Sequence, residues 1–306
     1  MSISQTKPER NSTLEGIGWM VLTGFMFACV TGVVRHLGSD MPAIEAAFIR
    51  YAIGLVLILP LVIRALRKHK PTAEEYKLYS IRGLVHGVAV MLWFYAMARI
   101  PIAEVTALGY TSPIFVTIGA WVFFKEALHV RRIFGILIGL VGVFIIVRPG
   151  FEQVNSGQLA QLATAPLFAA SFLIAKRLTE TADSATIVAM LSVGCTVVLL
   201  PGALLQWRTP TLEEVMWLAL TAVFATAGHY TLTRAFAAAP ITVTQPVSFL
   251  QLVWACLIGI LLFGEALDPY VILGGGIIVA AATYISHREA VAARRASTPP
   301  AAATKI

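Results

Sequence analysis

The sequence predicts an all-α integral membrane protein with ten transmembrane helices. Of its 306 residues, 58% are hydrophobic and 13% are charged, whereas soluble domains carry about 25% charged residues. The apolar residues form ten runs close to the ~20 residues that cross the hydrocarbon core, and the second five runs repeat the first five. These observations exclude a soluble domain. The net charge of +7 does not indicate a nucleic-acid-binding protein, because the basic residues are scattered between the runs.

The ten predicted helices are windows of high hydropathy separated by Pro, Gly and charged residues. The first window is interpreted as a retained helix, because it is longer than the apolar core of a signal sequence and lacks a small-x-small cleavage site. The predicted helices are residues 15–36, 42–64, 79–99, 102–124, 130–148, 157–178, 185–206, 212–238, 242–263 and 269–287.

The distribution of Lys and Arg predicts the orientation of the chain, because these residues are retained on the cytoplasmic side of a membrane. Eighteen of the 23 basic residues fall on the side that holds the N-terminus and five fall on the other. Both termini are therefore predicted to be cytoplasmic, with a leader at 1–14. The basic segment 288–306 is predicted to be a disordered cytoplasmic tail.

An internal repeat divides the chain into two halves, 15–148 and 157–287. A shift of 139 residues aligns 96–138 with 235–277 without a gap. Matched pairs include Pro101/Pro240, Phe124/Phe263, Glu126/Glu265, Ala127/Ala266, Leu128/Leu267 and Gly135/Gly274. Each half holds five helices, and because five is odd the second half enters the membrane from the opposite side. The sequence thus predicts a 5+5 inverted-topology repeat; the alternative is a duplication that only built a stable bundle.

Inverted repeats are typical of secondary transporters, in which a central site opens first to one side and then to the other. The chain also resembles the drug/metabolite transporter superfamily with two EamA-type halves. The resemblance rests on Arg50 and Tyr51 in the second helix and on the helix ends FFKEAL and LFGEAL. Within that superfamily it is similar to the YddG-type exporters of aromatic and other amino acids. The resemblance implies a multi-pass protein of the bacterial plasma (inner) membrane.

Polar and ionisable side chains inside the predicted helices are the candidate functional residues, because such groups are costly in hydrocarbon and tend to face a cavity or a partner. His86 and Trp93 recur at helical spacing in the third helix. His86 and His229, the latter in the eighth helix, could form a proton or polar relay, because imidazole titrates near neutral pH. The alternative for His86 is a neutral ring bonded to a backbone carbonyl.

The fourth and ninth helices correspond in the repeat and carry the other candidate substrate-binding residues. Tyr110 in the fourth helix and Trp254 in the ninth offer flat surfaces with one polar atom each. Ser248 and Gln251 lie three residues apart on one face of the ninth helix and could bond an amino or carboxylate group. The alternatives are helix packing for the aromatic rings and interhelical hydrogen bonds for the polar pair.

Three charged residues are assigned structural roles. Arg50 lies near the outer surface, where it could extend toward water, pair with Glu45 or Glu104, or meet a substrate carboxylate. Glu126 and Glu265 lie where one helix passes to the next, and each could bind free amides at the following helix N-terminus. We expect no metal, no cofactor and no enzymatic activity, because the chain has no HExxH motif, no Ser/His pair and no paired aspartates inside its helices.

The function predicted first is an alternating-access secondary transporter that exports small amphiphilic metabolites, foremost amino acids including aromatic ones. The alternative is an importer of a vitamin, a nucleotide-like compound or a sulfonium metabolite, and the sequence contains no residue that separates the two. The expected partners are a small-molecule substrate and the lipid bilayer, with no nucleic acid. A complete ten-helix duplication also predicts function as a monomer.

Overall fold

The computed structural model describes residues 10–38, 40–68, 71–112, 114–115, 118, 130–148, 153–178, 181–239, 244 and 247–297. The regular elements within these ranges are helices, and no strand occurs among them. The all-helical fold class is therefore confirmed.

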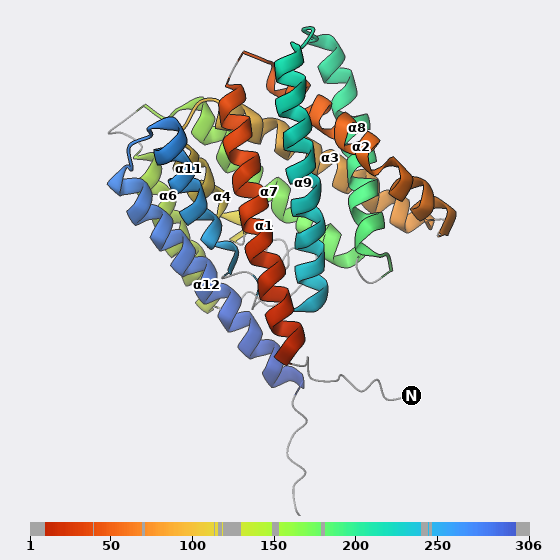
Figure 1. The fold of residues 1–306 in the computed structure, drawn as a ribbon. Coiled ribbons are helices and arrows are strands. Elements are labelled where there is room, and N and C mark those ends of the chain that lie inside the picture. The colour runs from red at the N-terminus through yellow and green to blue at the C-terminus, as the bar shows by residue number, and fades with distance from the viewer. Residues whose placement is uncertain are drawn as a thin grey trace, which may run out of the picture.

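The helices of the described residues form one bundle (Figure 1). Six of them, α1, α2, α3, α7, α8 and α9, are long and apolar enough to cross a membrane. The count of ten spans stays a prediction. In chain order the helices are α1 (Arg10–Leu37), α2 (Ala43–Lys68), α3 (Ala73–Met97), α4 (Ile102–Gly109), α6 (Val130–Val147), α7 (Ser156–Leu178), α8 (Ser184–Leu205), α9 (Leu212–Ala238), α11 (Leu250–Phe263) and α12 (Pro269–Ser297).

Six helix ends differ from the sequence prediction by four residues or more. Helix α2 ends at Lys68 rather than at 64, α4 ends at Gly109 rather than at 124, and α11 begins at Leu250 rather than at 242. Helix α1 begins at Arg10, inside the predicted leader, and α12 continues to Ser297, inside the tail that was predicted to be disordered. The residues after 287 are rich in Ala and Arg, which have high helix propensity. Helix α3 begins at Ala73 rather than at residue 79, because Thr72 and Glu75 form a capping box. This earlier start moves Arg82 well into the helix.

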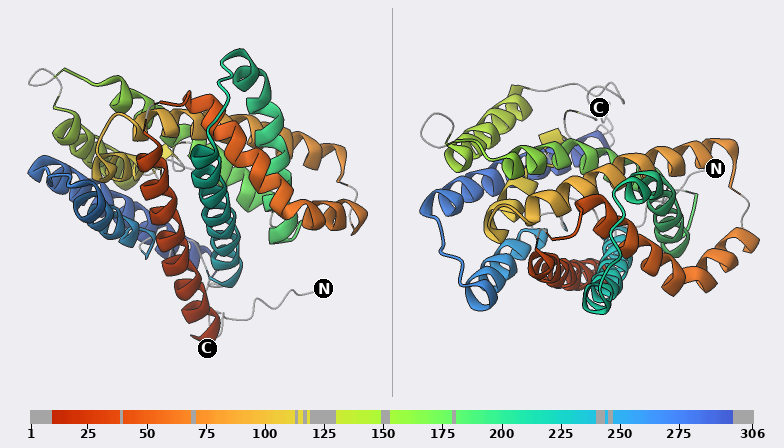
Figure 2. Two further views of the ribbon diagram at one scale, coloured as in Figure 1. Left: turned by 45° about the horizontal axis from the view of Figure 1, so that its top comes forward. Right: turned by 90° about the horizontal axis from the view of Figure 1, so that it is seen from above.

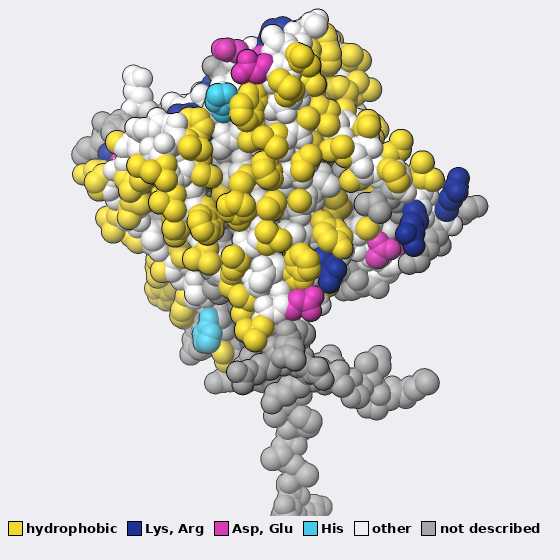
Figure 3. Space-filling model, viewed as in Figure 1, with side chains coloured by type: hydrophobic (Ala, Val, Ile, Leu, Met, Phe, Trp, Pro, Cys, Tyr) yellow, Lys and Arg dark blue, Asp and Glu magenta, His cyan; other side chains and the backbone are white. Residues whose placement is uncertain are grey.

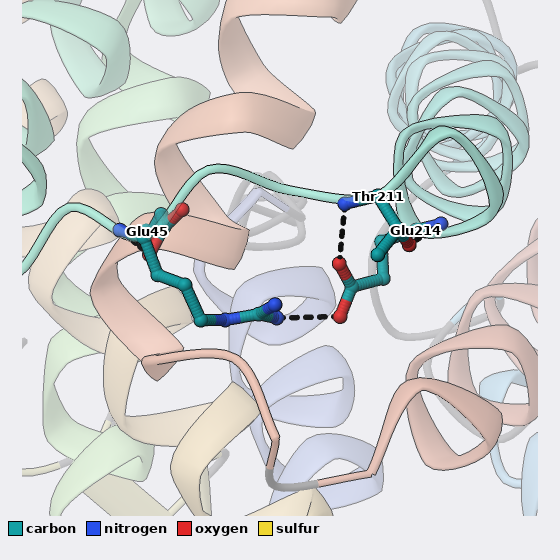
Figure 4. Close-up of polar contacts among 4 residues, drawn as sticks. Glu45, Thr211 and Glu214 are labelled. Carbon is teal, nitrogen blue, oxygen red and sulfur yellow. Dashed lines mark hydrogen bonds and ion pairs between the residues drawn. The ribbon is translucent and has the colours of Figure 1, made fainter.

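A second capping box begins α9 (Figure 4). The Thr211 hydroxyl accepts from the Glu214 backbone N–H at 3.2 Å, and the Glu214 carboxylate accepts from the Thr211 backbone N–H at 2.7 Å. The same carboxylate pairs with Arg208, and this hydrogen bond raises the pKa of the Arg208 guanidinium above its ordinary value. Glu45 of α2 accepts from the Arg208 backbone N–H at 3.1 Å, so the cap also joins α2 to the α8–α9 connection.

Replacing Thr211 with alanine is expected to lower the free energy of unfolding by about 1 kcal/mol, because the cap hydroxyl is lost while the backbone is unchanged. Thermal unfolding of the purified protein in detergent measures the effect. Thr209→Ala, in the same exposed connection, is the matched control and should unfold like the wild type. Equal losses in the two variants would contradict the cap assignment.

The outer surface of the bundle is apolar over its middle. Figure 3 shows hydrophobic side chains covering the centre of one face, with charged side chains nearer its ends. Large side chains such as Leu57, Phe134, Val197 and Leu261 are at least half exposed. Such a surface is unfavourable in water and suits contact with lipid chains.

Helices of the segment before residue 149 pair with helices of the segment after 152. Helix α1 packs on α9 and α3 packs on α7, while α2 packs on α8 and α6 on α12 (Figure 2). If each helix is exchanged for its counterpart in the repeat, this set of pairs maps onto itself. Tyr110 and Phe249, matched by the shift of 139 residues, have ring centroids 4.9 Å apart. Two matched residues can touch only near the pseudo-twofold axis that relates the two segments, so Tyr110 and Phe249 lie close to that axis.

Candidate functional site

Two histidines from different helices meet in the interior of the bundle. His86 of α3 is 1% exposed, and its Nδ1 lies 2.9 Å from the Ser171 hydroxyl oxygen of α7. The ring centroids of His86 and His229, the latter on α9, are 5.3 Å apart. The pair that the sequence predicted as a relay is therefore adjacent, and the partner of His86 Nδ1 is a side chain rather than a backbone carbonyl.

Aromatic rings surround the histidine pair. Phe168 of α7 lies with its ring centroid 5.1 Å from that of His86, and Tyr51 of α2 lies 6.5 Å from it. Phe27 of α1 is 5.2 Å from His229. All three contacts are edge-to-face, an arrangement that aromatic rings favour. The centre thus combines polar ring nitrogens with flat apolar surfaces, as small-molecule sites do.

A small cavity lies beside the histidines, between the two segments of the chain. The space is sufficient for about one water molecule. A larger molecule could enter this cavity only if its walls moved apart. The walls come from α2, α8 and α9 and consist of Arg50, Tyr51, Gly54, Val188, Leu191, Ser192, Thr226 and His229.

Arg50 has a different environment from the one predicted. Its guanidinium carbon lies 4.0 Å from the centroid of the Tyr51 ring, and the side chain is 6% exposed. Neither of its expected carboxylate partners is used: Glu45 binds the Arg208 backbone N–H, and Glu104 accepts from Gln158 Nε2 at 2.6 Å. The structural pairing expected of Arg50 is thus absent among the described residues, and Arg50 lines the central cavity instead.

Arg82 is a residue whose burial the sequence prediction missed. It was counted among the basic residues of the cytoplasmic side, and that side stays a prediction. The side chain is 3% exposed and donates from Nη1 to the Ile187 carbonyl oxygen at 3.1 Å. About one helical turn separates Arg82 from His86 on α3. The available signal was an arginine four residues before His86 on the same helix face.

Two glycines set the closeness of α3 and α8 beside this centre. A Cβ atom on Gly83 would lie 2.8 Å from the Gly194 Cα, and one on Gly194 would lie 3.0 Å from the Gly83 Cα. Small residues of this kind permit close helix contact in membranes. The Cys195 thiol donates to the Gly83 carbonyl at 3.7 Å, which places Cys195 next to the buried tyrosine and arginines.

The remaining predicted binding residues form a second group, and no described contact joins it to the histidines. The Tyr110 hydroxyl donates to the backbone carbonyls of Ser248 and Phe249 at 3.4 and 3.3 Å. Trp254 packs edge-on against Phe25 of α1 with centroids 5.9 Å apart. Gln251 also faces α1, and its Cβ would lie 3.8 Å from a Cβ on Gly24.

Trp93 and the two predicted structural glutamates complete the set. Trp93 lies half-buried against Phe94, with centroids 5.5 Å apart. Glu126 lies outside the described residues. Glu265 Oε2 accepts from the Ile102 backbone N–H at 3.0 Å, so its carboxylate binds the start of α4 in the other segment rather than the helix that follows. The start of α12 is bound instead by Asp268, which accepts from the Tyr270 backbone N–H at 2.8 Å.

Arg35, Glu265 and the backbone between α3 and α4 form a cluster that we call the clasp. Arg35 Nη2 of α1 lies 2.9 Å from Glu265 Oε1. Arg35 Nη1 also donates to the carbonyls of Met97 and Ile100, at 2.9 and 3.3 Å. The clasp joins both segments of the chain at the end of the bundle where α1 ends. Among the described residues no group of three His, Cys, Asp or Glu side chains could hold a metal ion.

These features define a multi-pass helical membrane protein with a buried polar centre between two paired segments. The comparison with families is consistent with this architecture: a model of the EamA-like transporter family matches residues 14–148 and 155–287. The protein belongs to this family, and the resemblance to proteins with two EamA-type halves is confirmed. The narrower similarity to YddG-type exporters stays a prediction. A transporter family also agrees with the prediction that the chain is not an enzyme.

Relatives of known name are similar over most of their length. The chain is 31% identical over 273 residues to a riboflavin transporter of Rhizobium johnstonii, covering 87% of this chain and 89% of the relative. It is 29% identical over 260 residues to a riboflavin transporter of Vibrio cholerae, covering 83% and 87%. It is 27% identical over 262 residues to an S-adenosylmethionine uptake transporter of Rickettsia bellii, covering 85% and 89%.

A solved crystal structure has the same fold. It superimposes with a TM-score of 0.57 at 17% identity and covers 94% of this chain and 99% of that chain. With these relatives, all bacterial, the prediction of a multi-pass protein of the bacterial inner membrane is confirmed. Neither export nor an amino-acid substrate, which were predicted first, has support among the named relatives.

Proposed function

We propose that the protein is an uptake carrier for a planar vitamin of the flavin type, with riboflavin as the reference substrate. The observation that carries the proposal is the buried centre, where Arg50, Tyr51 and His86 offer polar atoms beside aromatic rings. Riboflavin combines a flat heteroaromatic ring, whose carbonyl oxygens accept hydrogen bonds and whose ring N–H donates one, with a hydroxyl-rich chain. Ring faces and directed polar groups together match such a molecule.

The names of the relatives support the importer alternative over the amino-acid exporter. They comprise a vitamin and a sulfonium metabolite, both with ring systems larger than a free amino acid. Because the cavity has room for about one water molecule, substrate binding requires the segments to separate. The set of helix pairs is unchanged when each helix is replaced by its counterpart in the other segment. This symmetry supports two related arrangements of the carrier, each open to one side of the membrane.

Riboflavin uptake into liposomes that contain the purified protein tests the proposal. We expect saturable uptake that protein-free liposomes lack. Phe168→Ala should reduce it about 2- to 10-fold, because a ring beside His86 is lost. Phe134→Ala is the matched control, since Phe134 is 59% exposed on the lipid-facing surface, and it should leave uptake unchanged.

The same liposomes should be tested with S-adenosylmethionine, phenylalanine, threonine and methionine. Folded protein that gives no riboflavin flux would overturn the proposal. Flux of the amino acids alone would restore the amino-acid substrate predicted from the sequence.

A further inference from the structure

Two arginines are buried in the centre without acidic partners. Arg50 is 6% exposed and Arg82 is 3% exposed. Among the described residues no carboxylate lies within ion-pair distance of either guanidinium; Arg50 lies over the Tyr51 ring and Arg82 binds the Ile187 carbonyl. Buried charges are normally paired, because their transfer out of water is costly. The centre therefore carries positive charge that the described protein groups leave uncompensated.

Four polar atoms in this region are buried and have no hydrogen-bond partner among the described residues. They are Arg50 Nη1, Arg82 Nε, the Tyr51 hydroxyl and His86 Nε2. Leaving such groups unsatisfied costs free energy, and native proteins do so rarely. Arg50 and Tyr51 line the cavity directly, and His86 stands beside it through its contacts with Tyr51 and His229. A ligand that enters the cavity therefore meets unused donors.

The chemistry of these atoms is selective. The two arginine atoms can only donate, and a hydroxyl or an imidazole can donate as well. We propose that this cluster is a subsite for the hydrogen-bond-accepting edge of an uncharged or anionic ligand, and that it excludes cations. The inference rests on the proposed function and narrows it. The two carbonyl oxygens of the pyrimidinedione edge of a flavin fit the arginine donors, and the N–H between them fits a hydroxyl or imidazole that accepts. The sulfonium of S-adenosylmethionine would instead meet the Arg50 guanidinium in a poorly screened interior.

Equilibrium binding to the purified protein tests the subsite. The probes are riboflavin, flavin mononucleotide and orotate, which present accepting edges, and S-adenosylmethionine, which is a cation. We expect the wild type to bind riboflavin and to reject S-adenosylmethionine. Arg50→Gln should weaken riboflavin binding about 10- to 100-fold and reduce the discrimination against the cation. Arg50→Lys should keep the discrimination against the cation, because the positive charge remains. It should bind riboflavin more weakly, because lysine lacks the planar guanidinium with its fixed donors.

Arg99→Gln is the matched control. Arg99 also lies over a tyrosine, with its guanidinium carbon 3.5 Å from the Tyr95 ring centroid, but it is exposed. Its replacement should leave every affinity unchanged. Tyr51→Phe is the second test variant, to be used if Arg50→Gln does not fold. It removes a hydroxyl that has no partner among the described residues, so no hydrogen bond within them is lost. This variant should fold and bind riboflavin about 5-fold or more weakly.

The outcomes separate the subsite from the proposed function. Wild-type protein that binds S-adenosylmethionine as tightly as riboflavin would overturn the subsite, as would wild-type riboflavin affinity in both Arg50→Gln and Tyr51→Phe. If riboflavin is neither bound nor transported but orotate or flavin mononucleotide binds through Arg50, the subsite stands and the riboflavin assignment falls. If no accepting ligand binds, the subsite is overturned.

Discussion

Replacing Gly274 with valine is expected to prevent stable packing of α12 against α6, whereas the same change at Gly276 is tolerated. A Cβ on Gly274 would lie 2.5 Å from the Gly142 carbonyl oxygen and 2.7 Å from Ile146 Cγ1, while a Cβ on Gly276 would have nothing within 4 Å. A backbone oxygen 2.5 Å from the new Cβ cannot move aside as a flexible side chain can, so α6 and α12 must separate. Overpacking of this kind costs about 1–3 kcal/mol or more.

The two variants form a matched pair on one helix. Thermal unfolding and size-exclusion chromatography in detergent should show a large loss of stability or of monodisperse protein for Gly274→Val alone. Gly142→Val should reproduce that loss, because its Cβ would lie 2.7 Å from the Gly274 carbonyl oxygen. Equal stability of Gly274→Val and Gly276→Val would contradict the close α6–α12 contact.

Replacing Glu265 with alanine is the second change with a large expected effect. The substitution removes the ion pair with Arg35 and the hydrogen bond from the Ile102 backbone N–H together. Side-chain exposure is 24% for Arg35 and 13% for Glu265. Water can therefore replace the lost hydrogen bonds of the variant only in part. We expect a loss of about 2–3 kcal/mol in the free energy of unfolding, because hydrogen bonds to charged groups are strong and a partly buried amide loses its acceptor.

Glu15→Ala is the control for the clasp. Glu15 pairs with Arg234 at 3.3 Å, but both side chains are at least 40% exposed, and exposed pairs contribute about 0–1 kcal/mol. Thermal unfolding should therefore separate the two variants clearly. A Glu265→Ala protein as stable as Glu15→Ala would show that the clasp does not hold the two segments together. With the predicted orientation the clasp lies on the outer side, where its loss should also favour opening toward that side.

Hydropathy was sufficient to predict an all-helical membrane protein, and the family followed from the resemblance of the two halves and their FFKEAL and LFGEAL helix ends to EamA-type proteins. Hydropathy also singled out His86 and His229, because a histidine in an apolar run is unusual wherever the chain folds. The contact between these two rings depends on α3 and α9 lying near one another, which periodicity within a single helix does not encode. The sequence therefore identified members of the centre without predicting their arrangement.

Arg82 and Arg50 show why the rest of the centre was missed. A count of basic residues treats each arginine near a predicted helix end as a flanking charge, and the predicted start at residue 79 put Arg82 at such an end. The true start at Ala73 depends on the capping box, a local signal outside the apolar window. Arg50 had two acidic residues as plausible partners in the sequence, and only the tertiary structure shows both engaged elsewhere.

Entrance counterflow of riboflavin is the measurement that tests the proposed carrier most directly. Liposomes containing the protein are loaded with unlabelled riboflavin and then diluted into a trace of labelled riboflavin. The account predicts a transient accumulation of label above its equilibrium level, because an alternating site exchanges internal for external substrate. Arg50→Gln should lose this accumulation and Arg99→Gln should retain it. Label that enters no faster than into protein-free liposomes, with folded wild-type protein present, would contradict the account.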